Sequence, residues 1–146
     1  MQIIIALDNM SFDKALESLI KINHTLLEHT SMFENYEGEL FIDLKLWDTP
    51  VTVCSIVERV LEKGATMTTI STFNNEEVFK DLHQYAEDIK LIGVTYLTSW
   101  SASEQFQITR EMPHDMWRRN LTRIRKYGFA SIVCSAHDIK DMKDDS

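Results

Sequence analysis

Short apolar runs alternate with segments of helical spacing along this chain, and that alternation limits its possible folds more than any other feature. Residues 3–7 form an apolar run without a polar break, which is typical of a strand covered on both faces. Similar runs predict further strands at residues 20–23, 39–46, 67–71, 90–97 and 130–134. Between several of them, apolar residues recur at spacings of three and four and then stop at glycine. Six strand–helix units in series predict a parallel sheet with right-handed crossovers.

Polar residues stand at the C-terminal ends of all six predicted strands. They are Asp8, Lys21 to Asn23, Asp43 with Lys45, Ser71, Thr98 with Ser99, and Ser135. This pattern favours an α/β fold of the TIM-barrel type, whose sites lie at that end of the strands. A doubly wound open sheet is the alternative, but it favours a glycine-rich first turn, and residues 8–11 read Asp-Asn-Met-Ser. A closed barrel needs eight units, so residues 1–146 are expected to form a single, incomplete barrel domain of about six units.

Residues 98–112 are predicted to form a long polar loop between the fifth strand and the helix that follows it. Loops of this length in compact domains are often functional. The next helix is expected to follow Pro113, to place Trp117, Leu121 and Ile124 on one face, and to stop at Gly128.

Charge and cysteine content narrow the possible partners and compartments. The formal net charge is −8 and the pI is near 5.0, which argues against nucleic acid as a partner. A small anionic substrate requires that cations be concentrated locally. Cys54 and Cys134 form no disulfide framework, and the apolar run at residues 3–7 is too short for a signal peptide or membrane span. These observations predict a soluble, cytoplasmic protein.

Residues 41–50 combine a strand-like apolar run with two carboxylates and one ammonium group. Alternate side chains of a strand share a face, so Asp43 and Lys45 are expected to point to one side and the leucines after them to the other. Asp48 follows just past the strand end. Charges that are removed from water are costly unless they are paired. Three charged side chains at one strand end therefore contribute little to stability and are typical of a chemical site. We therefore predict the site here.

The same residues resemble a known family. Residues 43–48, Asp-Leu-Lys-Leu-Trp-Asp, are similar to the D-x-K-x-x-D signature of the orotidine 5′-monophosphate decarboxylases, and residues 50–53 match the P-x-T-V that follows it. Ile-Ala-Leu-Asp at 5–8, Val-Thr-Tyr-Leu-Thr-Ser at 94–99 and Ile-Val-Cys-Ser-Ala at 132–136 support the match. The four motifs occur in the family's order, and the resemblance covers essentially the whole chain.

The resemblance implies the last step of de novo UMP synthesis, the loss of CO₂ from orotidine 5′-monophosphate. It implies no metal and no organic cofactor, and a homodimer with shared active sites. The matching catalytic positions are Lys21, Asp43, Lys45 and Asp48, of which Asp48 would reach into the neighbouring subunit together with Thr52. The remaining substrate contacts would come from Asp8 at the ribose and from Thr98 and Ser99 at the pyrimidine, with Lys21 also binding substrate.

This array has an intelligible chemistry. Decarboxylation leaves negative charge on a ring carbon, and Lys45, held between Asp43 and Asp48, would stabilise that carbanion and then protonate it. The flanking carboxylates would keep Lys45 charged until it donates. Asp43 would lie near the departing carboxylate, where the crowding of two anions raises the energy of the ground state.

The sequence departs from the family in two places. Ser71 stands where the family usually has a histidine, and Asn74-Asn75 replaces small, glycine-like residues. The six units also leave out those that carry the family's phosphate-gripping arginine and closing loop, so a free-standing chain is expected to be feeble or inactive. The alternatives are therefore a non-catalytic remnant that folds and dimerises, and a related sugar-phosphate decarboxylase. The second shares D-x-K-x-x-D, but residues 94–99 and 48–50 speak against it.

The histidines and tryptophans are not expected to form a site. The five histidines show no ligand spacing, so a metal site is not expected. The tryptophans Trp47, Trp100 and Trp117 are expected in the core or at an interface rather than as platforms for substrate.

Overall fold

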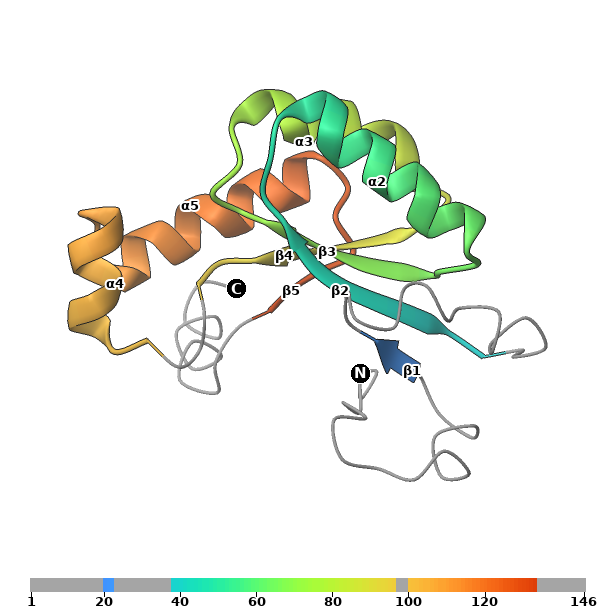
Figure 1. Cartoon of the computed structure of the whole chain (residues 1–146). Coiled ribbons are helices and arrows are strands. Elements are labelled where there is room, and N and C mark those ends of the chain that lie inside the picture. Colours follow the sequence, from blue (N-terminus) through green and yellow to red (C-terminus); the bar gives the residue numbers. More distant parts are fainter. Residues whose placement is uncertain (1–19, 23–37, 97–99, 134–146) are drawn as a thin grey trace.

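The structure, a computed structural model, describes residues 20–22, 38–96 and 100–133. These residues form one sheet of five parallel strands in the order β1-β2-β3-β4-β5 (Figure 1). The strands are β1 (Ile20–Ile22), β2 (Leu40–Leu46), β3 (Met67–Ser71), β4 (Lys90–Val94) and β5 (Ser131–Val133). They confirm five of the predicted strands, although β4 ends earlier than expected. The first predicted strand, at residues 3–7, lies outside the described residues.

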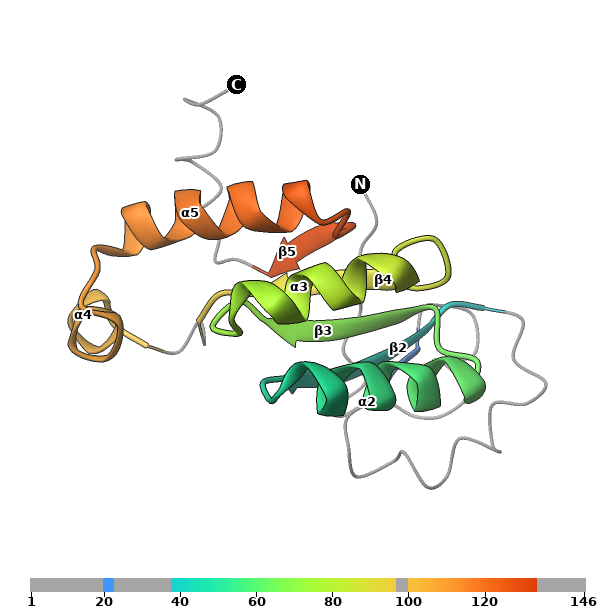
Figure 2. The ribbon, with the colours of Figure 1, turned by 90° about the horizontal axis from the view of Figure 1, so that it is seen from above.

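Three helices cover a single face of this sheet. They are α2 (Pro50–Glu62), α3 (Glu76–Leu82), which continues into the 3₁₀ turn η2 (His83–Tyr85), and α5 (Pro113–Lys126). Figure 2 shows the three side by side over the strands, with α4 (Ala102–Thr109) beyond the end of the sheet. Strands that follow each other in the chain are neighbours in the sheet, and every described crossover helix lies on the same side. This arrangement is typical of the wall of a (β/α) barrel and differs from that of a doubly wound sheet. The predicted α/β fold of the TIM-barrel type, incomplete over the described residues, is confirmed.

Local sequence sets the limits of these helices. Pro50 and Pro113 occupy the first turns of α2 and α5, where a missing N–H costs nothing. The side chain of Asn75 caps the start of α3. Gly64 and Gly128, which follow α2 and α5, have φ values of 78° and 75°, a conformation that glycine adopts without strain.

The prediction of a long loop over residues 98–112 is wrong, because α4 occupies much of that stretch. Ser101 and Glu104 form a capping box: the Ser101 side chain accepts from the Glu104 N–H, and the Glu104 carboxylate accepts from the Ser101 N–H. That S-x-x-E pattern is readable in the sequence and indicates a helix start within a polar segment. Arg110 ends the helix in a left-handed conformation, with φ 59°.

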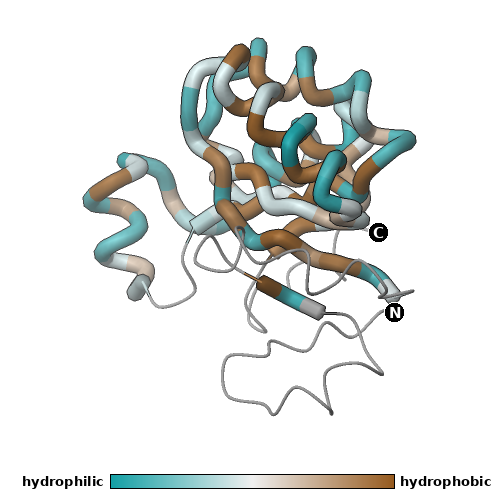
Figure 3. The backbone as a smooth tube through the Cα atoms, turned by 45° about the vertical axis from the view of Figure 1, so that its right-hand side comes forward, coloured by the Kyte–Doolittle hydropathy of each residue, from teal (hydrophilic) through white to brown (hydrophobic). Residues whose placement is uncertain are grey.

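The two faces of the sheet are packed differently. Toward the helices lies the larger core cluster, which includes Ile42, Ile70 and Leu91 from the strands and Val57 and Phe79 from the helices. On the opposite face lies a small cluster of Phe41, Met67 and Ile92. Apolar residues line the strands, whereas hydrophobic and hydrophilic residues alternate along the helices (Figure 3). Within the described ranges, no helix has the length and apolar character needed to cross a membrane.

Candidate active site

A distortion in β2 shapes the site. Ile42 pairs with Thr68 and Leu46 pairs with Ile70, so the three residues from 43 to 45 lie opposite Thr69 alone. This is a β-bulge, a device that redirects side chains locally. Within it Lys45 has φ 50°, in the left-handed region that residues other than glycine rarely adopt. The bulge therefore changes the backbone direction at the residues that carry the charged side chains, Asp43 and Lys45.

Lys21, Asp43 and Lys45 meet on the face of the sheet opposite the helices. One oxygen of Asp43, Oδ2, lies 2.9 Å from Lys21 Nζ and 2.8 Å from Lys45 Nζ. The Asp43 side chain is only 8% exposed, whereas those of Lys21 and Lys45 are 25% and 44% exposed. The predicted meeting of Asp43 and Lys45 on one face is therefore present, and the structure brings Lys21 to them. Two cations around one anion give this spot a positive character within an acidic chain.

The second oxygen of Asp43 is held by a residue that the sequence did not indicate. Thr69 donates its hydroxyl to Asp43 Oδ1 over 2.7 Å and accepts the backbone N–H of Lys45 over 2.8 Å. Thr69 is buried. Both oxygens of Asp43 are thus used within the site, and the position of Lys45 is linked to that of Asp43.

These contacts hold Asp43 ionised. Burial by itself would raise the pKa of the Asp43 carboxyl, but hydrogen bonds from Lys45, Lys21 and Thr69 outweigh it and lower the pKa below its usual value of 3.8. Asp43 therefore carries its negative charge at neutral pH and keeps the two ammonium groups close to each other.

A pocket of about 290 Å³ opens over this cluster. Its charged and polar wall is made by Lys21, Asp43, Lys45 and Thr69, and its apolar wall by Phe41, Val94 and Val133. Both ammonium groups can face a bound anion, and Lys45 can also deliver a proton. The arrangement suits a reaction in which negative charge develops next to Lys45.

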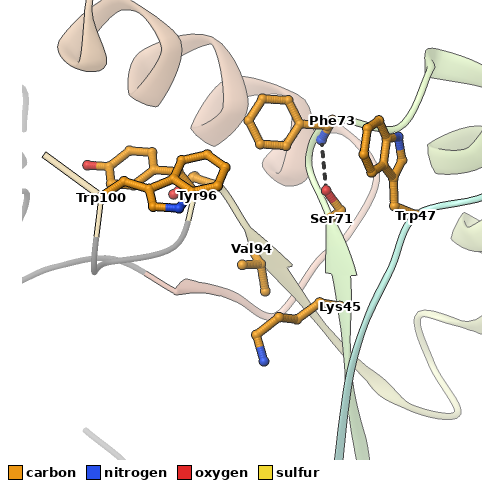
Figure 4. A pocket seen from close by; sticks show the side chains of 8 residues that line it. Lys45, Trp47, Ser71, Phe73, Val94, Tyr96 and Trp100 are labelled. Atoms are coloured by element: carbon orange, nitrogen blue, oxygen red, sulfur yellow. Dashed lines mark hydrogen bonds between the residues drawn. The ribbon is translucent and has the colours of Figure 1, made fainter. Parts of the chain in front are cut away.

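A second pocket of about 160 Å³, with aromatic side chains on two sides, adjoins Lys45. Figure 4 shows Trp47 beside Phe73 on one side, with ring centroids 6.3 Å apart, and Tyr96 with Trp100 on the other. Trp47 is 72% exposed, so of the two expected positions, core or interface, only the interface is open to it, whereas Trp117 is buried. Ser71, at the position where the family usually has histidine, also lines this pocket.

Asp48 and Thr52 lie together at the start of α2. The Asp48 carboxylate accepts the N–H of Thr49 over 2.7 Å, and hydrogen bonds from Thr49 and Thr52 lower the Asp48 pKa. Thr49 and Thr52 hydroxyls are 3.0 Å apart. Among the described residues, Asp48 makes no ion pair with Lys45. Asp48 is exposed, which leaves its role in a neighbouring site as a prediction.

Asn74 ties the end of β2 to the end of β3, and sequence reasoning missed it. Its amide donates to the carbonyls of Leu46 and Ser71 over 2.8 and 2.9 Å, and its Oδ1 accepts the Asp48 N–H over 3.2 Å. Asn74 is buried. Its three bonds fix the backbone on either side of Trp47.

The remaining predicted site residues, Asp8, Thr98 and Ser99, lie outside the described residues. Within residues 20–22, 38–96 and 100–133, no group of three or more histidine, cysteine or acidic side chains is placed to hold a metal ion.

Comparison with known proteins identifies the family of this chain. A sequence model of the Orotidine 5′-phosphate decarboxylase / HUMPS family matches residues 1–145. The orotidine 5′-phosphate decarboxylase of Aquifex aeolicus is 28% identical over 145 residues, which cover 93% of this chain and 62% of that protein. The enzyme of Shewanella sediminis is 35% identical over 111 residues, covering 72% of this chain and 47% of the relative. The chain thus spans roughly half to two thirds of these relatives.

Solved structures support the fold. The crystal structure of orotidine 5′-phosphate decarboxylase from Lactobacillus acidophilus has a TM-score of 0.75 and 20% identity, and the match covers 89% of this chain and 65% of that one. An uncharacterized conserved protein from Geobacillus kaustophilus has a TM-score of 0.77, 18% identity and coverage of 95% and 76%. The family match extends over nearly all of the sequence, including the strand that carries Asp43 and Lys45. The chain belongs to the Orotidine 5′-phosphate decarboxylase / HUMPS family.

Proposed function

We propose that this chain carries the decarboxylation site for orotidine 5′-monophosphate and that its product is UMP, in the pyrimidine pathway. The observation that carries the proposal is the Lys21–Asp43–Lys45 cluster, with both ammonium groups within 2.9 Å of one carboxylate oxygen. Family membership supports the reaction class. The pocket above the cluster supplies room for the reacting part of the substrate.

In the proposed step, the bond between the pyrimidine ring and its carboxylate breaks and CO₂ leaves. The electron pair of that bond stays on the ring carbon, and Lys45 Nζ stabilises it and then donates a proton to it. Asp43 holds Lys45 in position, and its own negative charge lies where the substrate carboxylate would approach. Lys21 shares the Asp43 oxygen and balances part of that charge. No metal or organic cofactor takes part in this step.

The proposal extends to the assembly and setting of the protein. We infer a homodimer in which Asp48 and Thr52 contact substrate in the neighbouring subunit, because exposed Asp48 just before α2 and half-buried Thr52 in its first turn lie outside the Lys21–Asp43–Lys45 cluster. Asp8, Thr98 and Ser99 keep their proposed contacts to ribose and pyrimidine. A cytoplasmic location without nucleic-acid partners fits the charge of −8 and the two cysteines.

The test is UMP formation from orotidine 5′-monophosphate by the purified chain and by two lysine variants. Lys45→Ala is expected to lower kcat by at least about 10³-fold, since Lys45 supplies both charge stabilisation and the proton. Lys90→Ala is the matched control, because its side chain is 47% exposed, close to the 44% of Lys45, and pairs with Glu39 outside the site. Equal activity in wild type and Lys45→Ala would contradict the assigned role.

A non-catalytic remnant is the second candidate, and the partial coverage of the relatives favours it. It predicts no turnover and no binding of UMP, measured by calorimetry on the wild-type chain. Binding in the micromolar range that is lost in Lys45→Ala but kept in Lys90→Ala would exclude it. A related sugar-phosphate decarboxylase, which shares D-x-K-x-x-D, would show turnover of a sugar-phosphate acid and none of orotidine 5′-monophosphate.

A further inference from the structure

We propose that Thr69 is a positioning residue for the site: its hydroxyl couples the backbone of Lys45 to the carboxylate of Asp43 and so fixes the lysine against the acid. The expected effect of Thr69 on the reaction rate rests on the proposed function. Its expected effect on the positions of Lys45 and Asp43 rests on the geometry of the site alone.

The bulge in β2 creates the need for such a residue. Three residues of β2 face Thr69 alone, so the regular ladder between β2 and β3 is interrupted there. The N–H of Lys45 bonds instead to the Thr69 hydroxyl oxygen over 2.8 Å. A side chain of β3 thus takes the place of a backbone acceptor, and a part-buried donor that would be costly to leave unpaired is satisfied.

The direction of the two bonds makes the hydroxyl a specific link. A threonine hydroxyl has one proton to donate and two lone pairs that accept. The Thr69 hydroxyl oxygen accepts a hydrogen bond from the Lys45 N–H, and its proton is donated to Asp43 Oδ1 over 2.7 Å. A bond to an ionised acceptor is stronger than one between neutral groups. One buried hydroxyl therefore fixes both the start of the Lys45 side chain and the plane of the Asp43 carboxylate.

Lys45 requires this support because its backbone is strained. Its φ of 50° lies in the left-handed region, which is unfavourable for a residue with a Cβ atom. Without the Thr69 hydroxyl, the backbone is free to relax toward an ordinary strand conformation. That change would swing a four-carbon side chain away from Asp43, and displacements of about 1 Å at a reacting group cost about 10²-fold in rate.

The neighbouring Thr68 supplies a matched comparison. Both threonines are buried, at 0% and 1% exposure, and both donate their hydroxyl to an acceptor on β2. Thr68 donates to the backbone carbonyl of Ile42 over 2.9 Å, and therefore touches neither charged group. Removal of either hydroxyl leaves a comparable defect in the same strand, but only one of the two defects reaches the site.

The first arm of the test is kinetic, with Thr69→Val, Thr69→Ser and Thr68→Val in the full chain. Thr69→Val is expected to lower kcat by about 10- to 100-fold with KM changed less than about threefold, because substrate contacts remain while the proton donor is misplaced. Thr69→Ser keeps the hydroxyl and should keep at least about half of kcat. Thr68→Val should match wild type in kcat. A loss of the same size in Thr68→Val would overturn the proposal, since it would show a general structural effect.

The second arm does not need turnover. The carboxyl carbon of Asp43 is followed by NMR during a pH titration of the same proteins, with Asp43→Asn used to assign it. Thr69 helps to lower the Asp43 pKa, so Thr69→Val should raise it, whereas Thr69→Ser and Thr68→Val should not. An unchanged Asp43 titration in Thr69→Val would refute the proposal whether or not the chain is active. If Thr69→Val does not fold, Thr69→Ala removes the same hydroxyl with a smaller side chain.

The two arms separate the possible failures. A wild-type chain that does not decarboxylate its substrate, but whose Asp43 titration shifts in Thr69→Val, would contradict the proposed function and support the role of Thr69. An active chain whose kcat and Asp43 titration are both indifferent to Thr69→Val would do the reverse.

Discussion

The two faces of the sheet are built from the same strands and have opposite properties. On the helix side, strand residues such as Ile42 of β2, Ile70 of β3 and Leu91 of β4 are buried in one continuous apolar cluster. On the other side the apolar cluster is small, and Lys21, Asp43 and Lys45 stand beside it. Strand alternation permits this division, because neighbouring residues point to opposite faces. One face holds the fold together, and the other is left free to hold charge.

The two faces also differ in the interactions that hold them together. The helix face is held mainly by the packing of apolar side chains. The site face contains a strained lysine, a buried carboxylate and a buried hydroxyl that all depend on one another. Functional sites commonly retain such strain because the surrounding structure holds it in place. Here that surrounding structure is the apolar face of the same strands.

The largest expected effect is on the helix face. Phe79 is fully buried and its ring packs against those of Tyr127 and Phe129, with centroids 6.2 and 5.3 Å away. Phe79→Ala should lower the free energy of unfolding by about 3–5 kcal/mol. Lys45→Ala, on the site face, should change it by less than about 1 kcal/mol, because the side chain is 44% exposed. Urea unfolding followed by circular dichroism measures both, and similar losses in the two variants would break the comparison.

Much of the fold, and part of the charged cluster, can be predicted from the sequence. Apolar runs and glycine stops located the described strands and most helices, because these features are local. The shared face of Asp43 and Lys45 followed from strand alternation and holds in the structure despite the bulge. The barrel type followed from the order of the units and from the family resemblance.

Thr69 and Asn74 could not be found in this way. Their bonds to β2 reach across 24 to 28 positions in the chain, and no local pattern records them. The bulge itself is also non-local, since it is defined by the pairing of β2 with β3. By contrast, the capping box of α4 is local, so this helix can be predicted from the S-x-x-E pattern even though the polar composition of the segment indicates a loop.

A smaller effect would sharpen the comparison by testing the strain on the site face. At an ordinary strand position, glycine is less stable than alanine by roughly 0.5–1 kcal/mol. Because Lys45 has φ 50°, the order should reverse, with Lys45→Gly more stable than Lys45→Ala by about 1 kcal/mol. Both variants lack the ammonium group, so their difference reports the backbone alone. Urea unfolding is the measurement, and a less stable Lys45→Gly would show that the left-handed conformation is not kept in solution.

The smallest effect concerns acid and the Asp43 carboxyl group on the site face. The Asp43 pKa is lowered in the folded chain, so its ionised form stabilises the fold above the ordinary pKa of 3.8, and that contribution disappears as pH falls through the lower folded value. Other carboxyl groups, including Asp48 and Glu76, also have lowered pKa values, so wild type alone cannot report on Asp43. The informative quantity is the free energy of unfolding of wild type minus that of Asp43→Asn. It should be constant above about pH 5 and decline at lower pH, because only the wild type then has an Asp43 carboxylate to protonate. A difference that stays flat down to the acid transition would mean that Lys21, Lys45 and Thr69 do not act on Asp43 as the structure indicates.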